Sequence, residues 1–309
     1  MRPDYREEPC RSALNRVKGM SFKWSLNPYT GCVHRCTFCY VRAFELRADR
    51  PFDDRYGRSI RVKTNVADVL RRELHRKSWQ REVVAIGAAT DPYQPAEGHY
   101  RLTRACLEAL VEVANPISLI TRGPMIVRDI DVLQQASALA EVSVSVSIPT
   151  LDHDVWVRTE PGTAPPRQRL TMIRRLSDAG IRIGIGMAPI LPGLSDRPEQ
   201  LAEVVRAARD AGAHFVWTNL LYLRPGTREH FLDNLARDWP ELLPAYEKLY
   251  AGRAYLPKAA GEPVRREVAR LRKLFGIGDG LSAQTIIPPG AEVVPGQLPE
   301  EVTQLALAM

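Results

Sequence analysis

Residues 142–188 contain a complete strand–helix–strand unit that decides the fold class of the chain. The stretch 142–148 reads VSVSVSI and alternates valine with serine, which predicts a strand. A helical pattern over 166–179 ends before Gly180, and IRIGIGMA at 181–188 predicts the next strand. Strands that are joined through a helix of this length pack as parallel neighbours in one sheet.

The same alternation extends in both directions from this unit. Strand patterns recur at 22–26, 83–88, 117–121 and 214–218, and helical patterns recur at 62–79, 102–114, 125–139 and 198–211. Strand and helix therefore alternate about six times, which is too few for a closed eightfold barrel. The sequence predicts an α/β fold built as an open (β/α)6 barrel, a partial TIM barrel. A doubly wound flat sheet is the alternative.

The segments on either side of this core have a different composition. We expect an N-terminal extension at 1–20, a core domain at 21–225, a helical extension at 226–275 and an irregular tail at 276–309. In the helical extension, prolines separate three expected short helices, and the last of these, at 264–275, is rich in arginine. The tail has many Gly and Pro residues and little periodicity.

Composition places the chain among globular proteins. Its 309 residues are 45% hydrophobic and 26% charged, which excludes disorder as the global state. No run reaches the ~20 apolar residues of a membrane helix, and the charged N-terminus lacks the apolar part of a secretory signal. We therefore expect a cytoplasmic protein with no membrane partner. The net charge of +7 permits a polyanionic partner, although the basic pairs lie beside acidic residues on expected helices.

Three of the five cysteines lie close together in the chain. Residues 25–40 read SLNPYTGCVHRCTFCY, so Cys32, Cys36 and Cys39 have the spacing C-x3-C-x2-C. Clustered thiols in a chain without a secretion signal favour metal binding over disulfides. Three thiolates on one loop can hold three corners of an iron–sulfur cube and leave one iron without a protein ligand.

This loop resembles that of the radical S-adenosylmethionine (SAM) enzymes, whose signature is C-x3-C-x-aromatic-C, with Phe38 as the aromatic residue. The resemblance implies a [4Fe-4S] cluster, reductive cleavage of SAM to a 5′-deoxyadenosyl radical that abstracts hydrogen from an unknown substrate, and an electron donor such as a flavodoxin or a ferredoxin. The alternative is a zinc site completed by His34 or Cys10 in a nucleic-acid-binding protein. Zinc sites of that kind usually present two ligand pairs, and no second pair exists here.

A narrower resemblance, over about residues 20–225, is to radical SAM proteins related to spore photoproduct lyase. The matching segments are WSLNPYTGCVHRCTFCY at 24–40, GAATDPYQPAE at 87–97, LITRGPMIVRDIDVL at 119–133 and RTEPGTAPPRQRLTMIRRLSDAGI to APILPGLSD at 158–196. In spore photoproduct lyases a hydrogen-donating cysteine precedes the pair that matches Thr90 and Asp91, where this chain has Ala89. This departure argues against a DNA photolesion lyase, which stays an alternative. Cys106, on an apolar helix face, is expected to be buried.

The resemblance also implies a SAM pocket at the carboxyl ends of the expected strands, where the active sites of β/α barrels gather. The Phe38 backbone would approach the adenine, and Thr90 and Asp91 would contact the amino group or the methionine moiety. Arg122 would bind the carboxylate, where the branch often has a lysine, and an arginine fork suits a carboxylate. Ser147 would reach the carboxylate or the ribose.

Each of these assignments has a plainer alternative. Asp91 could form a turn with the proline that follows it, Arg122 could be a solvated loop residue, and Ser147 could be chosen for its small size. Candidate catalytic residues are Tyr40, Tyr93 and Gln94, which either line the substrate pocket or pack under the cysteine loop.

Overall fold

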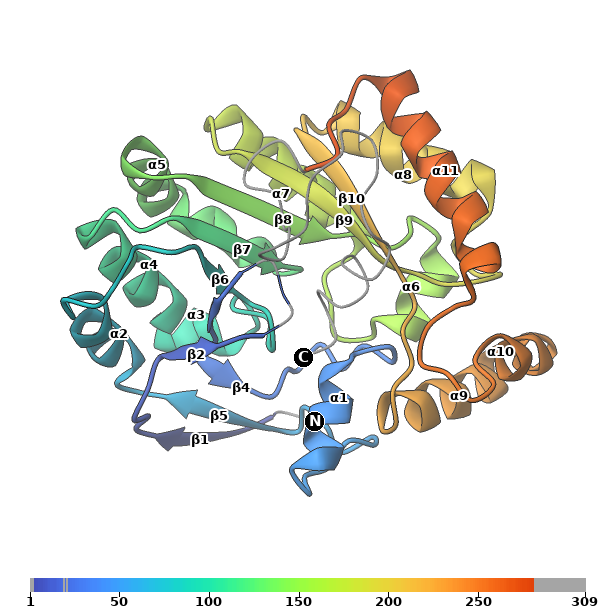
Figure 1. Ribbon diagram of the computed structural model, residues 1–309, viewed down its shortest axis with the longest axis horizontal. Coiled ribbons are helices and arrows are strands. Elements are labelled where there is room, and N and C mark those ends of the chain that lie inside the picture. The colour runs from blue at the N-terminus through green and yellow to red at the C-terminus, as the bar shows by residue number, and fades with distance from the viewer. Residues whose placement is uncertain (1–2, 19, 21, 281–309) are drawn as a thin grey trace.

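The computed structural model describes residues 3–18, 20 and 22–280, and its core is an open, mostly parallel sheet (Figure 1). The strand order is β10-β9-β8-β7-β6-β3-β2. The strands are β2 (Leu14–Arg16), β3 (Trp24–Leu26), β6 (Val84–Ile86), β7 (Ile117–Thr121), β8 (Val142–Ser147), β9 (Ile183–Ile190) and β10 (Phe215–Leu220). Only β2 runs antiparallel to its neighbour in this sheet as described. The six parallel strands are those that the sequence predicts, and the predicted fold class is confirmed.

Helices that connect these strands cover the outer face of the sheet (Figure 1). They are α2 (Val66–Leu74), α4 (Leu102–Glu112), α5 (Ile130–Leu139), α7 (Pro166–Asp178) and α8 (Pro198–Asp210). Each buries an apolar stripe against the strands; Leu110 on α4 and Ile173 on α7 are fully buried. The helix expected over 125–139 begins as a 3-10 segment, η1 (Pro124–Asp129), before it continues as α5.

A second sheet, which the sequence patterns do not predict, lies at the lower left of Figure 1. Its order is β1 (Asp4–Glu8), β5 (Ser59–Lys63) and β4 (Tyr29–Thr30). The helix expected over 62–79 is therefore wrong at its start. Ile60 and Val62 are fully buried on one face of β5, and this alternation over five residues is too short to stand out in the sequence.

Short helices and the C-terminal helices complete the fold. They are α1 (Val41–Arg47), α3 (Ala96–Tyr100), α6 (His153–Thr159), α9 (Thr227–Asp238), η2 (Pro240–Leu242), α10 (Leu243–Leu249) and α11 (Lys258–Phe275). The last helix begins at Lys258 and includes Pro263, so the start expected at residue 264 is wrong. It packs against α8 and β10, while α9 packs against α1. Most of the expected irregular tail, residues 281–309, lies outside the described residues.

Within the part of the chain that the structure describes, none of the helices combines the length and the apolar character that crossing a membrane requires.

Candidate active site

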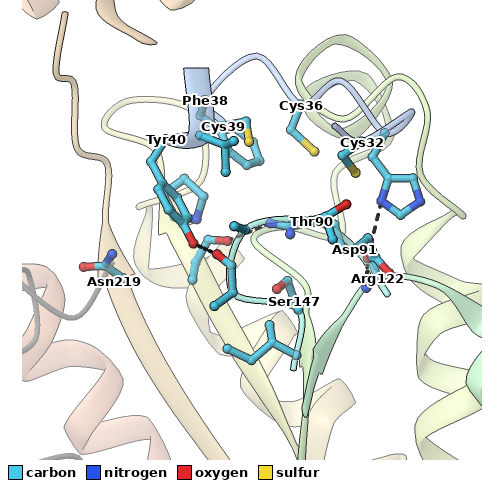
Figure 2. A pocket seen from close by; sticks show the side chains of 18 of the residues that line it. Cys32, Cys36, Phe38, Cys39, Tyr40, Thr90, Asp91, Arg122, Ser147 and Asn219 are labelled. Atoms are coloured by element: carbon cyan, nitrogen blue, oxygen red, sulfur yellow. Dashed lines mark hydrogen bonds and ion pairs between the residues drawn. The ribbon is translucent and has the colours of Figure 1, made fainter. Parts of the chain in front are cut away.

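A pocket at the carboxyl ends of the parallel strands collects most of the residues that the sequence singles out (Figure 2). The pocket is open to solvent, and its empty space, part of the solvent at its mouth included, is about 1080 Å³. Of the predicted site residues, it is lined by Cys32, Cys36, Phe38, Cys39, Tyr40, Thr90, Asp91, Arg122 and Ser147. Because parallel strands end together at one edge of a sheet, residues that are far apart in the chain meet here.

The three cysteines lie on the loop between β4 and α1. None of them is in a disulfide, and Figure 2 shows their sulfur atoms at the upper edge of the pocket, facing the same space. Gly31 starts this loop with φ +87°, and a Cβ there would lie 2.9 Å from the Ser59 carbonyl oxygen, so the turn requires glycine. A set of thiols beside open pocket space fits a cluster that is held at three corners.

The thiols are buried beside cationic groups. Burial raises the pKa of the Cys36 and Cys39 thiols, and the Arg122 and Arg42 guanidinium groups oppose that rise at Cys36 and Cys39, respectively. Since ligation requires thiolates, these cations favour the ligating form.

Thr90 and Gln94 form hydrogen bonds with the backbone at the start of the cysteine loop. The Thr90 hydroxyl donates to the Gly31 carbonyl oxygen at 2.6 Å. Gln94 donates to the same oxygen at 3.1 Å and accepts from the Val33 N–H at 3.2 Å. Gln94 is fully buried and does not line the pocket. Of the two roles that the sequence leaves open for Gln94, the structure therefore shows packing under the loop.

Tyr93 also lies away from the pocket. Its side chain is buried, and its hydroxyl donates to Asp129 at 3.1 Å. Tyr40 does line the pocket; its hydroxyl donates to the Ala88 carbonyl oxygen, and its ring meets Phe44 edge to face at 5.8 Å. Of the three catalytic candidates, the structure therefore places Tyr40 alone in the pocket.

Asp91 joins the segment after β6, the end of β7 and the cysteine loop. One carboxylate oxygen accepts from the Thr121 hydroxyl at 2.7 Å and from the Tyr93 N–H at 2.9 Å. The other oxygen accepts from the Arg122 N–H at 2.6 Å and lies 3.4 Å from His34 Nδ1. Burial opposes ionisation, but these partners lower the pKa of Asp91 to about 2. With both oxygens occupied, Asp91 organises the pocket wall.

His34 is a buried partner of both Asp91 and Cys32, although its position in the sequence suggests an ordinary loop residue. Burial alone would lower its pKa, yet the Cys32 thiol and the Asp91 carboxylate raise it to about 10. Burial raises the pKa of Cys32, but His34 outweighs it and lowers that pKa overall. His34 therefore links the first cysteine to the organising carboxylate.

Arg122 reaches the pocket from a buried ionic network that sequence analysis did not find. Its Nε donates to Glu160 at 2.6 Å and its Nη2 donates to the Ala188 carbonyl oxygen at 3.2 Å. Glu160 also pairs with Arg169 at 3.1 Å, and both of these side chains are fully buried. The Arg122 guanidinium lies 5.8 Å from the centre of the Phe38 ring. The segments at 119–133 and 158–196 contain Arg122, Glu160 and Arg169, but nothing in the sequence indicates that they pair.

The opposite wall of the pocket, along β10, is uncharged. Trp217 donates through its indole N–H to the Ser145 hydroxyl at 2.6 Å. Asn219 and Tyr222 follow. Within the described residues, the Asn219 side-chain amide oxygen is buried without a hydrogen-bond partner, whereas the Tyr222 hydroxyl lies beside Tyr255 and Arg224. Figure 2 shows Asn219 across the pocket from Arg122. This wall leaves no local signal in the sequence, because its polar residues are scattered along an otherwise apolar strand.

Ala89, at the position where spore photoproduct lyases have a hydrogen-donating cysteine, lies in the pocket. The Ala89 N–H donates to the Asn27 side chain at 2.9 Å. Cys106 is fully buried in the core on α4, as predicted, and does not line the pocket. No described cysteine other than the three on the loop lines the pocket.

Comparison with known proteins now agrees with the geometry. Residues 26–205 match the model of the radical SAM superfamily. The chain belongs to the radical SAM superfamily. It is 39% identical over 270 residues to an uncharacterised protein of Mycobacterium tuberculosis, an alignment that covers 86% of this chain and 79% of that protein. It is 25% identical over 263 residues to the radical SAM Nalpha-GlyT isomerase of Pseudomonas phage M6, covering 84% of this chain and 52% of that protein.

Among solved structures, the fold is similar to that of a spore photoproduct lyase variant with bound AdoMet and dinucleoside spore photoproduct. The TM-score is 0.66 at 17% identity, covering 89% of this chain and 80% of that chain. The protein is a radical SAM enzyme, and its cofactors are a [4Fe-4S] cluster and SAM. Family membership also argues against the zinc-stabilised alternative.

Proposed function

We propose that Cys32, Cys36 and Cys39 bind the [4Fe-4S] cluster and that the pocket cleaves SAM reductively to act on a substrate held against β10. The observation that carries this proposal is that three thiols on one loop and the Arg122 guanidinium line the same pocket. When bound, the cluster supplies the electron that breaks the sulfonium C–S bond and yields the 5′-deoxyadenosyl radical. The protein positions SAM and keeps water from the radical.

The polar residues at the strand ends supply the SAM site in this proposal. Arg122 binds the carboxylate with the part of its guanidinium that Glu160 leaves available. Ser147, buried at the end of β8, lies within the same pocket and meets the carboxylate or the ribose. The Phe38 backbone approaches the adenine, and Thr90 acts by fixing the loop at Gly31.

Tyr40 and the β10 wall form the substrate side in this proposal, with Tyr40 as the candidate catalytic residue. We also propose that the core spans residues 21–225, with extensions at 1–20 and 226–275, and that a flavodoxin or a ferredoxin donates the electron. The cofactor demands a one-electron donor of low potential, which is the chemistry of these carriers.

Cleavage of a DNA photolesion is the second candidate function. The fold resembles that of spore photoproduct lyase, and the net charge of +7 suits a polyanionic substrate. Ala89, which lines the pocket where those lyases have a cysteine, argues against it. A lesion-containing oligonucleotide would separate the two candidates, because absence of SAM-dependent repair by an enzyme that still cleaves SAM would remove the lyase.

The test of the proposed function is anaerobic reconstitution with iron and sulfide, followed by dithionite and SAM. We expect a brown protein that forms 5′-deoxyadenosine, detected by chromatography. Cys36→Ala should lose at least about 100-fold of this activity, since a corner of the cluster loses its ligand. Cys106→Ala is the matched control, because Cys106 is buried outside the pocket. A colourless protein with stoichiometric zinc and no SAM cleavage would refute the proposal.

A further inference from the structure

We propose that Glu160 is a positioning residue that fixes the Arg122 guanidinium so that its outer edge meets the carboxylate of SAM. The inference rests on the proposed function, which gives Arg122 the carboxylate. Glu160 itself does not line the pocket; it acts through Arg122.

The hydrogen bonds of Arg122 show which edge remains for a ligand. The Nε–H donates to Glu160 at 2.6 Å, and one Nη2–H donates to the Ala188 carbonyl oxygen at 3.2 Å. Within the described residues, Nη1 has no hydrogen-bond partner and Nη2 keeps one hydrogen without a partner. These hydrogens are the donors that Arg122 has left for a carboxylate.

Glu160 is itself held rigidly. Both of its oxygens accept from Arg169 Nη1, at 3.3 and 3.1 Å, and Glu160 and Arg169 are fully buried. Arg169 also donates to the Ser147 carbonyl oxygen at 2.8 Å and to the Ala164 carbonyl oxygen at 2.8 Å. Glu160 therefore ties the direction of Arg122 to the carboxyl end of β8, the strand that ends at Ser147.

The charges of this network favour an anion in the pocket. Arg122, Glu160 and Arg169 together carry one more positive than negative charge. An excess positive charge held in a buried wall is stabilised when an anion binds beside it.

The segment that carries Glu160 also holds the cysteine loop. The Thr159 carbonyl oxygen accepts from the Thr37 N–H at 2.9 Å, and the Gly162 N–H donates to the His34 carbonyl oxygen at 3.1 Å. A Cβ at Gly162 would lie 2.4 Å from the Val33 carbonyl oxygen, so the two segments are in close contact. Residues 159–162 thus fix Glu160, and through it Arg122, relative to the cysteine loop.

The test compares two nucleosides that differ in the group Arg122 would bind. S-adenosylhomocysteine has the amino-acid carboxylate and is not cleaved, whereas 5′-methylthioadenosine lacks the amino-acid moiety. Binding to the reconstituted protein is measured by calorimetry. We expect Glu160→Gln to lower the affinity for S-adenosylhomocysteine by about 10- to 100-fold, which is the effect of losing a charge-assisted hydrogen bond. Binding of 5′-methylthioadenosine should change less than about twofold.

A double-mutant cycle shows whether Glu160 acts through Arg122. In an Arg122→Gln background, Glu160→Gln should add no further loss of S-adenosylhomocysteine affinity. Three results would each overturn the inference. Glu160→Gln could lower the affinity for both nucleosides equally, it could leave the affinity for S-adenosylhomocysteine unchanged, or the two substitutions could have additive effects in the cycle. If Glu160→Gln does not fold, Glu160→Asp decides with the same two ligands, since it keeps the charge and withdraws it from Arg122.

The proposed function and this inference fail in different ways. A wild-type protein that forms no cluster and binds no S-adenosylhomocysteine contradicts the proposed function. A wild-type protein that cleaves SAM, paired with a Glu160→Gln variant of normal selectivity between the two nucleosides, contradicts the inference alone.

Discussion

The two walls of the pocket are built on opposite principles. At the cofactor wall, Asp91 and Glu160 are buried ionic groups, and each accepts several hydrogen bonds from neighbouring elements. At the β10 wall, the Asn219 side-chain amide oxygen is buried without a hydrogen-bond partner among the described residues, and the pocket has no charged residue there. A saturated network holds one geometry, while unpaired polar atoms await a partner. The difference agrees with the proposed arrangement, in which a fixed cofactor site faces a substrate site that is completed by its ligand.

Removing the charge of Asp91 should break the cofactor wall. In Asp91→Asn, buried His34 loses the carboxylate that is its partner. One carboxylate oxygen is also replaced by an NH2 group, which cannot accept the hydrogen bonds that its neighbours donate. We expect a loss of about 3 kcal/mol in the free energy of unfolding, together with weaker S-adenosylhomocysteine binding. Denaturant titration and calorimetry measure the two effects.

Asp131→Asn is the control for this prediction. Asp131 also pairs with an arginine, Arg104, at 2.7 Å, but its side chain is 57% exposed. An exposed pair contributes about 0–1 kcal/mol. Equal losses from Asp91→Asn and Asp131→Asn would contradict the claim that burial makes the cofactor wall rigid.

A buried asparagine at the β10 wall should respond in the opposite direction to one in the core. Asn219 has an unpaired buried oxygen, so Asn219→Leu should raise the free energy of unfolding by about 1 kcal/mol. Asn115 accepts from Trp79 at 2.9 Å and donates to the Glu82 and Pro116 carbonyl oxygens. Asn115→Leu should therefore lower the free energy of unfolding by about 2 kcal/mol.

The Asn219→Leu variant also tests whether the β10 wall is separate from the cofactor wall in function. Asn219→Leu should keep wild-type affinity for S-adenosylhomocysteine, because Asn219 lies across the pocket from Arg122. It should also keep the formation of 5′-deoxyadenosine in the absence of substrate. Destabilisation by Asn219→Leu, or loss of cofactor affinity in that variant, would place Asn219 in the cofactor network instead.

These contrasts also mark how far the sequence could predict the molecule. The parallel strands and the three cysteines follow from local patterns, since periodicity and spacing are written in adjacent residues. Glu160 and Arg122 are 38 residues apart, and their pairing depends on strand order rather than on any local motif. The two asparagines have the same side chain, and burial with or without partners separates them only in the folded chain.

The smallest predicted effect concerns the outer support of the cofactor wall. Helix α9 packs on α1, and its Thr227 hydroxyl donates to the Cys39 carbonyl oxygen at 3.2 Å. His230, on the same helix, is buried near Arg42 and 4.0 Å from Asp54. Burial and then Arg42 lower the pKa of His230 to about 4, although Asp54 opposes them.

The sign of the pH effect follows from that depressed pKa. The unfolded chain protonates His230 near its ordinary value of 6.5, whereas the folded protein keeps it neutral down to about pH 4. The contribution of neutral His230 to the free energy of unfolding is therefore fully present above pH 6.5 and is lost as the pH decreases towards 4. We expect a loss of about 1 kcal/mol at pH 5, or ~2–4 °C in melting temperature, which His230→Gln should remove. Because other groups titrate in both proteins, the quantity to measure is the difference in the free energy of unfolding between the variant and the wild type at each pH. A difference that does not change with pH would contradict the prediction and would show that α9 supports the cysteine loop without His230.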